Sequence, residues 1–330
     1  MISIHERYEI EKQNMRNLTL LTISLLLLGG CSDEENLPDS LGKENRYPLI
    51  IQSVMVNPEI ATRVAGYDEL AIGKNIGIFM EGAPGSSGYV AANNIQYNHT
   101  ADGYTPNNAN QTIYLGAQNA NICAYYKPVL DVADKTKAAL TSANYTEARD
   151  LVYAKNVVKN GTAAGSQIIF NMEHAYSQIE FSFERKNYPN TCKITDVTLK
   201  NSALIKTATL NIATAVYTTT GTAAELSFKT NETTPDTGIT VPATGASDKV
   251  SLLAVPCTLA NTDGTNGLTV TFKVDDKDMS MKIPYAKLGA LKVGTRHQIT
   301  ASLNGTDIDV VSVQVAKWSD SDEGTFEPEP

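Results

Sequence analysis

The chain has 330 residues, and its 27 Lys and Arg stand against 36 Asp and Glu, which gives a formal net charge of −9. This acidity, with no basic stripe along the chain, excludes nucleic acid as an expected partner, because phosphate binding needs clustered positive charge. The four histidines and four cysteines show no metal-ligand spacing, and the sequence contains no nucleotide-binding or nucleophile motif. We therefore expect no metal, no cofactor and no enzymatic activity.

An apolar run near the start predicts a secretory signal peptide. Residues 18–28 read LTLLTISLLLL, which is too short for a membrane-spanning helix of about 20 residues but typical of a signal-peptide core. Arg16 supplies the positive charge before this core, and Met15 directly precedes it, so we expect translation to start at Met15. Residues 1–30 are thus assigned to the signal peptide, and the part that is translated is predicted to be removed on export.

The apolar run ends at Leu28-Gly29-Gly30-Cys31, which resembles the cleavage site of bacterial lipoproteins. The resemblance implies cleavage before Cys31, lipid on its thiol and attachment to the outer membrane; an ordinary signal peptide with a chance cysteine is the alternative. Residues 31–47 are polar and predict a flexible tether. Its acidic start, Ser32-Asp33-Glu34-Glu35, resembles a cell-surface export tag of lipoproteins in Gram-negative anaerobes, and a plain solvated linker is the other interpretation.

Beyond the tether, alternating apolar and polar residues predict β-strands. In the segment QIEFSFE, Ile179, Phe181 and Phe183 face one way and their polar neighbours face the other. Turn residues separate the strands: residues 275–277 predict one hairpin, and Asn304-Gly305, a strong hairpin signal, predicts the last one. About fourteen strands at this spacing predict an all-β fold of two tandem antiparallel β-sandwich domains.

Three irregular segments complete the predicted domain plan. A polar break near 185–189 places a boundary between an N-terminal domain, 48–186, and a C-terminal domain, 187–318. Residues 131–148 have a helix-like composition and predict one or two short helices within a loop. Residues 319–330 are acidic and contain two prolines, so we expect a disordered tail.

The remaining cysteines and the single tryptophan are interpreted as structural. Cys123, Cys192 and Cys257 lie far apart in the sequence. Three buried thiols are the first interpretation, and one disulfide with one free thiol is the second. Trp318 closes the last predicted strand and is interpreted as a core residue.

Five stretches of the sequence, taken in order, carry the pattern of one protein family. They are ATRVAGYDELAIGKNIGIF at 61–79, NICAYYKP at 121–128, IIFNMEHAYSQIEF at 168–181, LLAVPCT at 252–258 and a final hairpin that ends at Trp318. Together they resemble the fimbrillin-like proteins, which are subunits and accessory proteins of type V pili. The sequence departs from the family pattern at Lys127, which precedes a proline, at Cys257, which replaces a glutamine, and in the acidic tail after Trp318. The tail would hinder polymerisation from that end.

The resemblance implies Greek-key, transthyretin-like sandwich domains in a lipoprotein of the cell surface or fimbrium. It also implies that an arginine-specific surface protease removes an N-terminal strand, and that a strand from another pilin subunit fills the vacated groove to build a pilus for cell adhesion. Arg63, at the family's Thr-Arg position, and Arg46 are the candidate cleavage sites. Arg63 is preferred because cleavage at Arg46 would leave the strand in place; an uncleaved anchor or accessory subunit is the alternative.

The removable strand is predicted at 47–56, YPLIIQSVMV, which is apolar on both faces like a strand buried on both sides. The C-terminal strand, 308–318, is the candidate donor or pairing strand. The predicted exchange residues are Tyr47, Leu49, Ile51, Val54, Val56, Val311, Val313, Val315 and Trp318. The alternative function is a glycan-binding surface lipoprotein of a polysaccharide-uptake system; the single tryptophan argues against it, because glycan sites commonly stack sugars on aromatic rings.

Overall fold

The computed structural model describes residues 46–56, 68–86, 88–162, 166–189, 191–245, 247–261, 267–305, 307–318 and 327–328, and all of these belong to one compact unit. The predicted signal peptide, the lipid site Cys31, the tether up to residue 45 and the cleavage site Arg63 lie outside them. Within the described part, no helix has the length and apolar composition needed to cross a bilayer.

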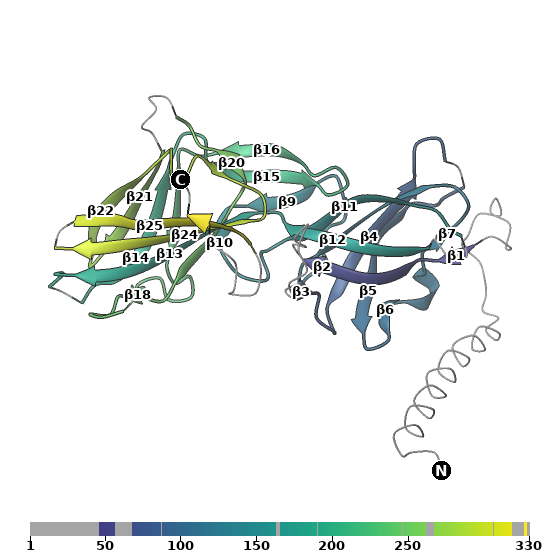
Figure 1. Ribbon diagram of the computed structural model, residues 1–330, viewed down its shortest axis with the longest axis horizontal. Coiled ribbons are helices and arrows are strands. Elements are labelled where there is room, and N and C mark those ends of the chain that lie inside the picture. Colours follow the sequence, from purple (N-terminus) through teal and green to yellow (C-terminus); the bar gives the residue numbers. More distant parts are fainter. Residues whose placement is uncertain are drawn as a thin grey trace, which may run out of the picture. The chain divides into compact units, whose positions relative to one another are not determined.

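The regular secondary structure of the described residues is almost entirely β-strand, which confirms the predicted fold class (Figure 1). An eight-stranded sheet contains most strands of the first half of the chain. In spatial order these are β3 (Asp68–Glu69), β2 (Ile50–Val56), β12 (Gln167–His174), β11 (Val152–Lys159), β8 (Ala120–Tyr126), β4 (Asn75–Gly82), β5 (Ala92–Thr100) and β6 (Gly103–Pro106). Beside it, β1 (Tyr47–Pro48) pairs with β7 (Tyr114–Leu115), and a 3-10 turn spans Ala109–Gln111.

The remaining strands, most of them from the second half of the chain, form two larger sheets and two small ones. The six-stranded sheet has the order β10 (Ala143–Asn144), β19 (Val250–Ala254), β13 (Ser177–Lys186), β24 (Thr295–Asn304), β25 (Asp307–Lys317) and β26 (Glu327–Pro328). The five-stranded sheet has the order β17 (Glu225–Lys229), β14 (Lys193–Lys200), β21 (Gly267–Val274) and β22 (Lys277–Pro284), with β18 (Ile239–Thr240) also paired to β14. The small sheets are β16 (Val216–Thr222), β15 (Ile205–Asn211) and β9 (Ala138–Thr141), and β20 (Cys257–Thr258) with β23 (Ala290–Leu291).

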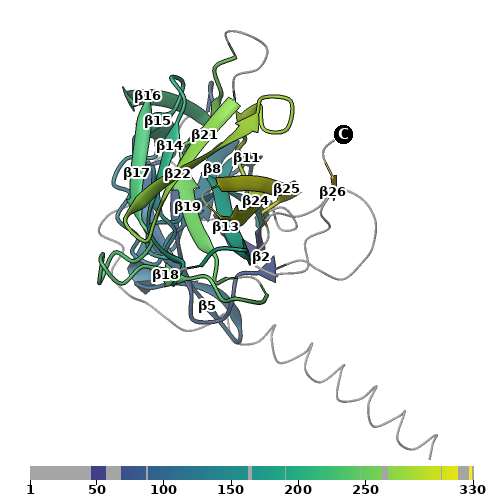
Figure 2. The same ribbon diagram turned by 90° about the vertical axis from the view of Figure 1, so that its left-hand side faces the viewer.

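Buried apolar side chains form three clusters. The first fills the space between the six-stranded and five-stranded sheets, which face each other as a sandwich (Figure 2). At its centre, Phe272 meets Phe181 and Phe183 edge to face, with ring centroids 5.2 and 4.9 Å away. The second cluster lies on one face of the eight-stranded sheet. The third lies on the opposite face, where β4, β8 and β11 pack against β9 and β15.

Both predicted hairpins are confirmed. The strands β21 and β22 pair from Gly267 with Pro284 to Val274 with Lys277, and the turn between them places Asp275 and Asp276 at positive φ. The strands β24 and β25 pair along their whole length around Gly305, which has a φ of 61°. Glycine adopts this left-handed conformation without steric cost, which explains the strength of the hairpin signal.

The strand β13 belongs with the strands that follow it, although the sequence places it before the predicted boundary near residue 187. It pairs in parallel with β24 over nine residues and antiparallel with β19. Its apolar face, Ile179, Phe181 and Phe183, is fully buried in the cluster between the two larger sheets. The polar residues 185–189 therefore mark the end of a strand, and the chain passes from one sheet to the other earlier, between β12 and β13.

The helices predicted within residues 131–148 are wrong, because this segment forms β9 and β10. Asp134 accepts hydrogen bonds from the backbone N–H and the hydroxyl of Thr136, which forms a turn instead of a helix start. After that turn, Ala138 and Leu140 are buried while Ala139 and Thr141 are exposed, the period of a strand. Pairing with β15 satisfies the backbone of this segment, so tertiary contacts override its helical propensity.

Close packing around Gly77 explains why the motif NIGIF has a glycine at this position. A Cβ at this position would lie 2.2 Å from the Tyr125 ring and 2.4 Å from Asn94 Oδ1. Tyr125 crosses β4 at this point, donates a hydrogen bond from its hydroxyl to Asn94, and accepts one from the Val132 backbone N–H. The motif is therefore a packing requirement between β4 and β8.

Candidate strand-exchange site

The strand β2 lies between β12, to which it is parallel, and the two-residue strand β3. Its register with β12 runs from Ile50 beside Gln167 to Val56 beside Met172, with an irregularity before Ser53. At the start of the strand, the Leu49 backbone N–H donates to the Ile113 carbonyl over 2.8 Å. The segment is thus an integral strand of the eight-stranded sheet.

The side chains of β2 divide cleanly between two environments. Leu49, Ile51, Val54 and Val56 are at most 8% exposed and join the core cluster on one face of the sheet. Ile50, in contrast, is 46% exposed. The expectation that the segment is buried on both faces is therefore wrong, because nothing described covers the outer face at Ile50 and Gln52.

The predicted exchange residue at the start of this segment contributes less than the others. Tyr47 is only half-buried and pairs with Leu115 in the short β1–β7 ladder. Arg46 stands directly before this ladder, so cleavage after it would leave both β1 and β2 on the chain.

Withdrawal of β2 would uncover a defined slot. Its neighbour β12 buries Ile168, Phe170 and Met172, each at most 1% exposed, in the same cluster as the β2 side chains. Among the described residues, β3 pairs with no strand other than β2, so it would lose its place in the sheet. Unpaired backbone of β12 and an apolar floor would remain, which are the features that accept an incoming strand.

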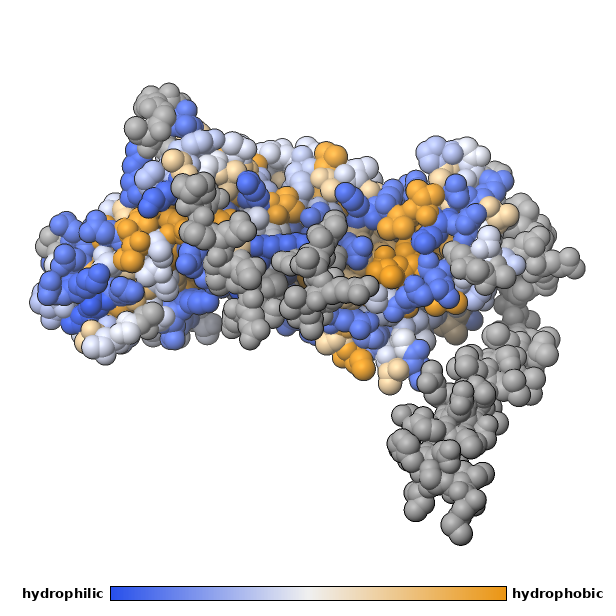
Figure 3. All heavy atoms as spheres, viewed as in Figure 1, coloured by the Kyte–Doolittle hydropathy of each residue, from blue (hydrophilic) through white to orange (hydrophobic). Residues whose placement is uncertain are grey.

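Exposed apolar residues also gather on the outer face of this sheet. Figure 3 shows hydrophobic side chains over β11, β12 and β2. Val158 is 55% exposed and Ile169 is 47% exposed. Ile169 follows Gln167, the register partner of Ile50, by two residues. Scattered exposed apolar residues are common on proteins, so this face by itself identifies no ligand.

The strand β25 holds the C-terminal residues of the predicted exchange set. It pairs with β24 at ten positions, with an irregularity at Val311, between Val310 and Ser312, that changes which face the side chains occupy. Val311 is 48% exposed, Val313 and Val315 are half-buried, and Trp318 beyond the strand is 1% exposed. The prediction that Trp318 is a core residue is confirmed.

Trp318 closes a buried polar junction that the sequence does not reveal. Its indole stacks on the imidazole of His174, with ring centroids 3.8 Å apart and planes within 6°. His174 ends β12, and its Nδ1 lies 2.7 Å from a carboxylate oxygen of the buried Asp150. Tyr145 packs edge-on against the same indole, and the Trp318 backbone N–H donates to the Gly294 carbonyl over 2.8 Å.

The segment HAYSQ continues this junction along β13. Gln178 and Arg296 are neighbours in the parallel β13–β24 register, and the Arg296 Nε–H donates to the Gln178 side-chain carbonyl over 2.8 Å. Two residues further, Glu180 accepts a hydrogen bond from the Gln298 side chain over 2.9 Å. Polar side chains that are buried in this way require such partners, and here the two strands supply them to each other.

The family-like stretches at 168–181 and at the C-terminus therefore meet in space. Sequence reasoning identified both stretches but not their contact. The available signal was the position of His174, which follows Ile168, Phe170 and Met172 in the buried phase of the alternation. A histidine in that phase has to find a polar or aromatic partner inside the protein.

The three described cysteines are free. Cys123 and Cys192 are buried and Cys257 is half-buried, so the first interpretation holds for two of the three thiols. Burial raises the pKa of Cys123 to about 12 and the pKa values of Cys192 and Cys257 to about 11. Thiols of such high pKa are poor nucleophiles. No group of His, Cys, Asp or Glu within the described ranges is arranged to hold a metal ion.

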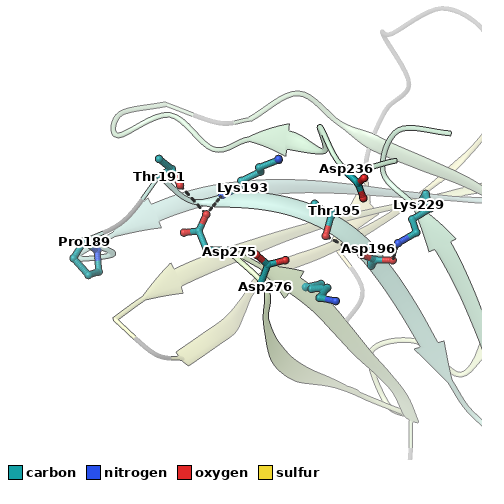
Figure 4. A pocket seen from close by; sticks show the side chains of 10 residues that line it. Pro189, Thr191, Lys193, Thr195, Asp196, Lys229, Asp236, Asp275 and Asp276 are labelled. Carbon is teal, nitrogen blue, oxygen red and sulfur yellow. Dashed lines mark hydrogen bonds and ion pairs between the residues drawn. The ribbon is translucent and has the colours of Figure 1, made fainter. Parts of the chain in front are cut away.

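A charged groove of about 1080 Å³ lies at one end of the C-terminal sandwich (Figure 4). Asp275 accepts hydrogen bonds there from the Thr191 hydroxyl and the Lys193 backbone N–H, and Asp196 lies 2.6 Å from Lys229 Nζ. Its lining residues are Pro189, Thr191, Lys193, Thr195, Asp196, Lys229, Asp236, Lys273, Asp275 and Asp276. The lining contains no aromatic ring, so this groove gives the glycan-binding alternative no stacking surface.

His297 makes the folded state sensitive to acid. It lies in β24 beside Val315, it is 2% exposed, and burial lowers its pKa from the ordinary 6.5 to about 4. The unfolded chain therefore binds more protons than the folded chain between these values, and stability falls as the pH falls through this window. We expect a loss of about 3 kcal/mol between pH 7 and pH 4 from this residue.

Chemical denaturation at several pH values measures this effect. His297→Gln should flatten the dependence between pH 6.5 and pH 4 relative to the native protein, because the glutamine does not titrate. An unchanged slope in the variant would contradict the assignment to His297.

The comparisons with known proteins agree with this architecture. A model of the fimbrillin-like family matches residues 62–318. A candidate cell adhesion protein from Bacteroides uniformis has a similar solved structure, with a TM-score of 0.56 and 20% identity over 81% of this chain and 98% of its own. One from Bacteroides ovatus has a TM-score of 0.57 and 18% identity over 84% of this chain and 100% of its own.

These similarities in structure concern the fold, since the sequence identities are low. Among curated proteins, none matches this chain. The family match, however, covers most of the chain, from just after β2 to the buried Trp318. The chain belongs to the fimbrillin-like family.

Proposed function

We propose that the protein is a pilus subunit or accessory protein that assembles by strand exchange and serves cell adhesion. The observation that carries the proposal is the position of β2: it is an N-terminal strand seated in the sheet, while the family match begins at residue 62, after it. The solved structures from Bacteroides uniformis and Bacteroides ovatus, described as candidate cell adhesion proteins, support the adhesive role.

The proposed route begins at the membrane. Export by the signal peptide and lipid on Cys31 would place the protein at the outer membrane with residues 46–318 at the cell surface. An arginine-specific protease would then cut after Arg63, which releases β2 together with the lipid anchor. Cleavage after Arg46 would release the lipid alone, since β1 and β2 follow that residue. A strand from another subunit would fill the vacated slot.

The energetics of the slot favour a long-lived joint. An incoming strand would regain main-chain hydrogen bonds with β12, each contributing roughly 1 kcal/mol net. It would also fill the positions of Leu49, Ile51, Val54 and Val56, where a fully buried aliphatic side chain contributes about 1.5–3 kcal/mol. Ordering a flexible strand costs roughly 1–2 kcal/mol per residue. The joint is therefore stable when the donor matches the four apolar positions.

The candidate donor strand is already paired within its own sheet. Residues 308–318 are the candidate, and Val311 offers an exposed apolar side chain. For β25 to leave its own sheet, ten pairs with β24 and the Trp318–His174 stack would have to break. This arrangement favours a role for β25 as a pairing strand that stays in its sheet.

Limited digestion with an arginine-specific protease tests the proposal. We expect the native protein and Arg46→Lys to lose β2 and to form concentration-dependent oligomers, visible by electron microscopy as fibres or short chains. Arg63→Lys should stay monomeric. A peptide of residues 47–56 added in excess should block oligomers, and the same peptide with Val54→Asp should not. Trimmed protein that lacks β2 and remains monomeric would refute strand exchange.

A further inference from the structure

The strand β25 stands at the edge of the six-stranded sheet. Its inner side pairs with β24 along ten positions, whereas its outer side pairs only at Gln314 and Val315, with the two residues of β26 (Figure 2). Across the part of the chain that the structure describes, no strand pairs with the outer side of residues 307–313, although β22 of the facing sheet comes close to β25. Most of this edge thus lacks a hydrogen-bonded partner strand.

This edge is held in a fixed position. Val310 and Val313 pack against the core between the two large sheets. Ile308 near the start of the strand is 5% exposed, and Trp318 just after it is 1% exposed. Such a strand presents its unpaired backbone N–H and C=O groups in extended form, which is a template for pairing with another strand. The exposed side chain of Val311 adds apolar area beside this edge.

The charges along β25 select a mode of pairing. Asp307 and Asp309 lie near its start and Lys317 lies at its end, and all three side chains are exposed. Two copies of β25 running antiparallel would place the acidic end of each strand opposite the basic end of the other. Parallel copies would set like charges side by side. Antiparallel pairing of identical strands also generates a closed twofold dimer.

The acidic tail of the chain already occupies part of this edge. Glu327 pairs with Val315 and Pro328 pairs with Gln314 in antiparallel register. The last twelve residues contain five acidic residues and two prolines. Proline has no N–H to donate, and charge at a sheet edge discourages further strands, which are the two devices by which proteins protect such edges. The tail therefore has the chemistry of an edge cap.

We propose that the outer edge of β25 is an interaction surface for β25 of a second copy of this chain, and that β26 blocks the C-terminal end of this edge in the free protein. The partner is identified by the complementary ends of the strand, and β26 by its pairing at Gln314 and Val315. This surface is separate from the β2 slot, on a different sheet. The inference therefore does not depend on cleavage at either arginine.

A chain that ends at Trp318 tests this inference with β2 left intact. Analytical ultracentrifugation should show a concentration-dependent dimer for the shortened chain and a monomer for a chain with the full tail. At low concentration, one of the two amides, Gln314 or Val315, should exchange about tenfold faster in the shortened chain, because only the N–H that points toward β26 loses its partner. At high concentration, protection should extend over residues 307–315.

Two variants make the test specific. Replacing residues 319–330 by a Gly-Ser segment of equal length should also allow dimers, since length alone does not cap the edge. Val311→Lys in the shortened chain should abolish the dimer, because an added charge at an edge opposes pairing. A shortened chain that stays monomeric at every concentration would overturn the inference. So would a dimer whose protection falls outside β25. Neither result would bear on strand exchange at the β2 slot.

Discussion

Replacing Trp318 with alanine is expected to lower the free energy of unfolding by about 3–5 kcal/mol, the range for large aromatic residues removed from a core. The indole is 1% exposed and stacks on His174. Its loss would open a cavity beside a buried polar pair, His174 and Asp150. Because His174 ends β12, the damage should reach the sheet that also holds β2.

Urea denaturation of Trp318→Ala, followed by circular dichroism, measures the effect. Val311→Ala is the matched control, since Val311 is an apolar residue of the adjoining strand that is 48% exposed, and it should change stability by about 0.5 kcal/mol or less. Trp318→Phe should recover part of the loss because a ring can still stack on His174. Equal stabilities for Trp318→Ala and Val311→Ala would show that the junction contributes little.

Replacing Val54 with aspartate should be at least as damaging, with an expected loss of about 3–5 kcal/mol. Val54 is 0% exposed in the centre of β2 and belongs to the apolar cluster that includes Phe170. A carboxylate there would be buried without a partner among these apolar side chains, so the strand would be driven from its slot. In terms of the proposed function, this variant should mimic the trimmed protein and form oligomers without a protease.

The matched control lies in the same strand on the other face. Ile50→Asp changes a side chain that is 46% exposed, so it should cost about 1 kcal/mol or less. Thermal unfolding of both variants compares the two faces directly, and sedimentation shows whether Val54→Asp alone assembles. If Val54→Asp is destabilised but remains monomeric, an open slot is insufficient for assembly. If both variants unfold like the native protein, β2 is not held as the structure shows.

Much of the local structure could be predicted because its signals are local. The alternation in QIEFSFE follows from the twofold period of a strand. The hairpin at Gly305 follows from a residue that tolerates positive φ. The helix prediction for residues 131–148 failed because it used local signals alone. The composition of this segment favours a helix, and its strands form only through pairing with β15 and β19. The prediction that the outer face of β2 is buried failed because burial depends on which other segments cover a strand, and the residues of the strand itself do not encode this.

The sequence by itself determined the all-β class, the hairpins, the apolar N-terminal strand and the membership of the fimbrillin-like family. Each of these depends on residue types at fixed spacing. Only the tertiary structure decided that β2 runs parallel to β12, that β13 joins the later strands, and that His174 stacks on Trp318. These features join segments that are far apart in the chain. The alternation of apolar and polar residues in a strand is compatible with many partner strands, so side-chain packing and strand register determine which partner it pairs with.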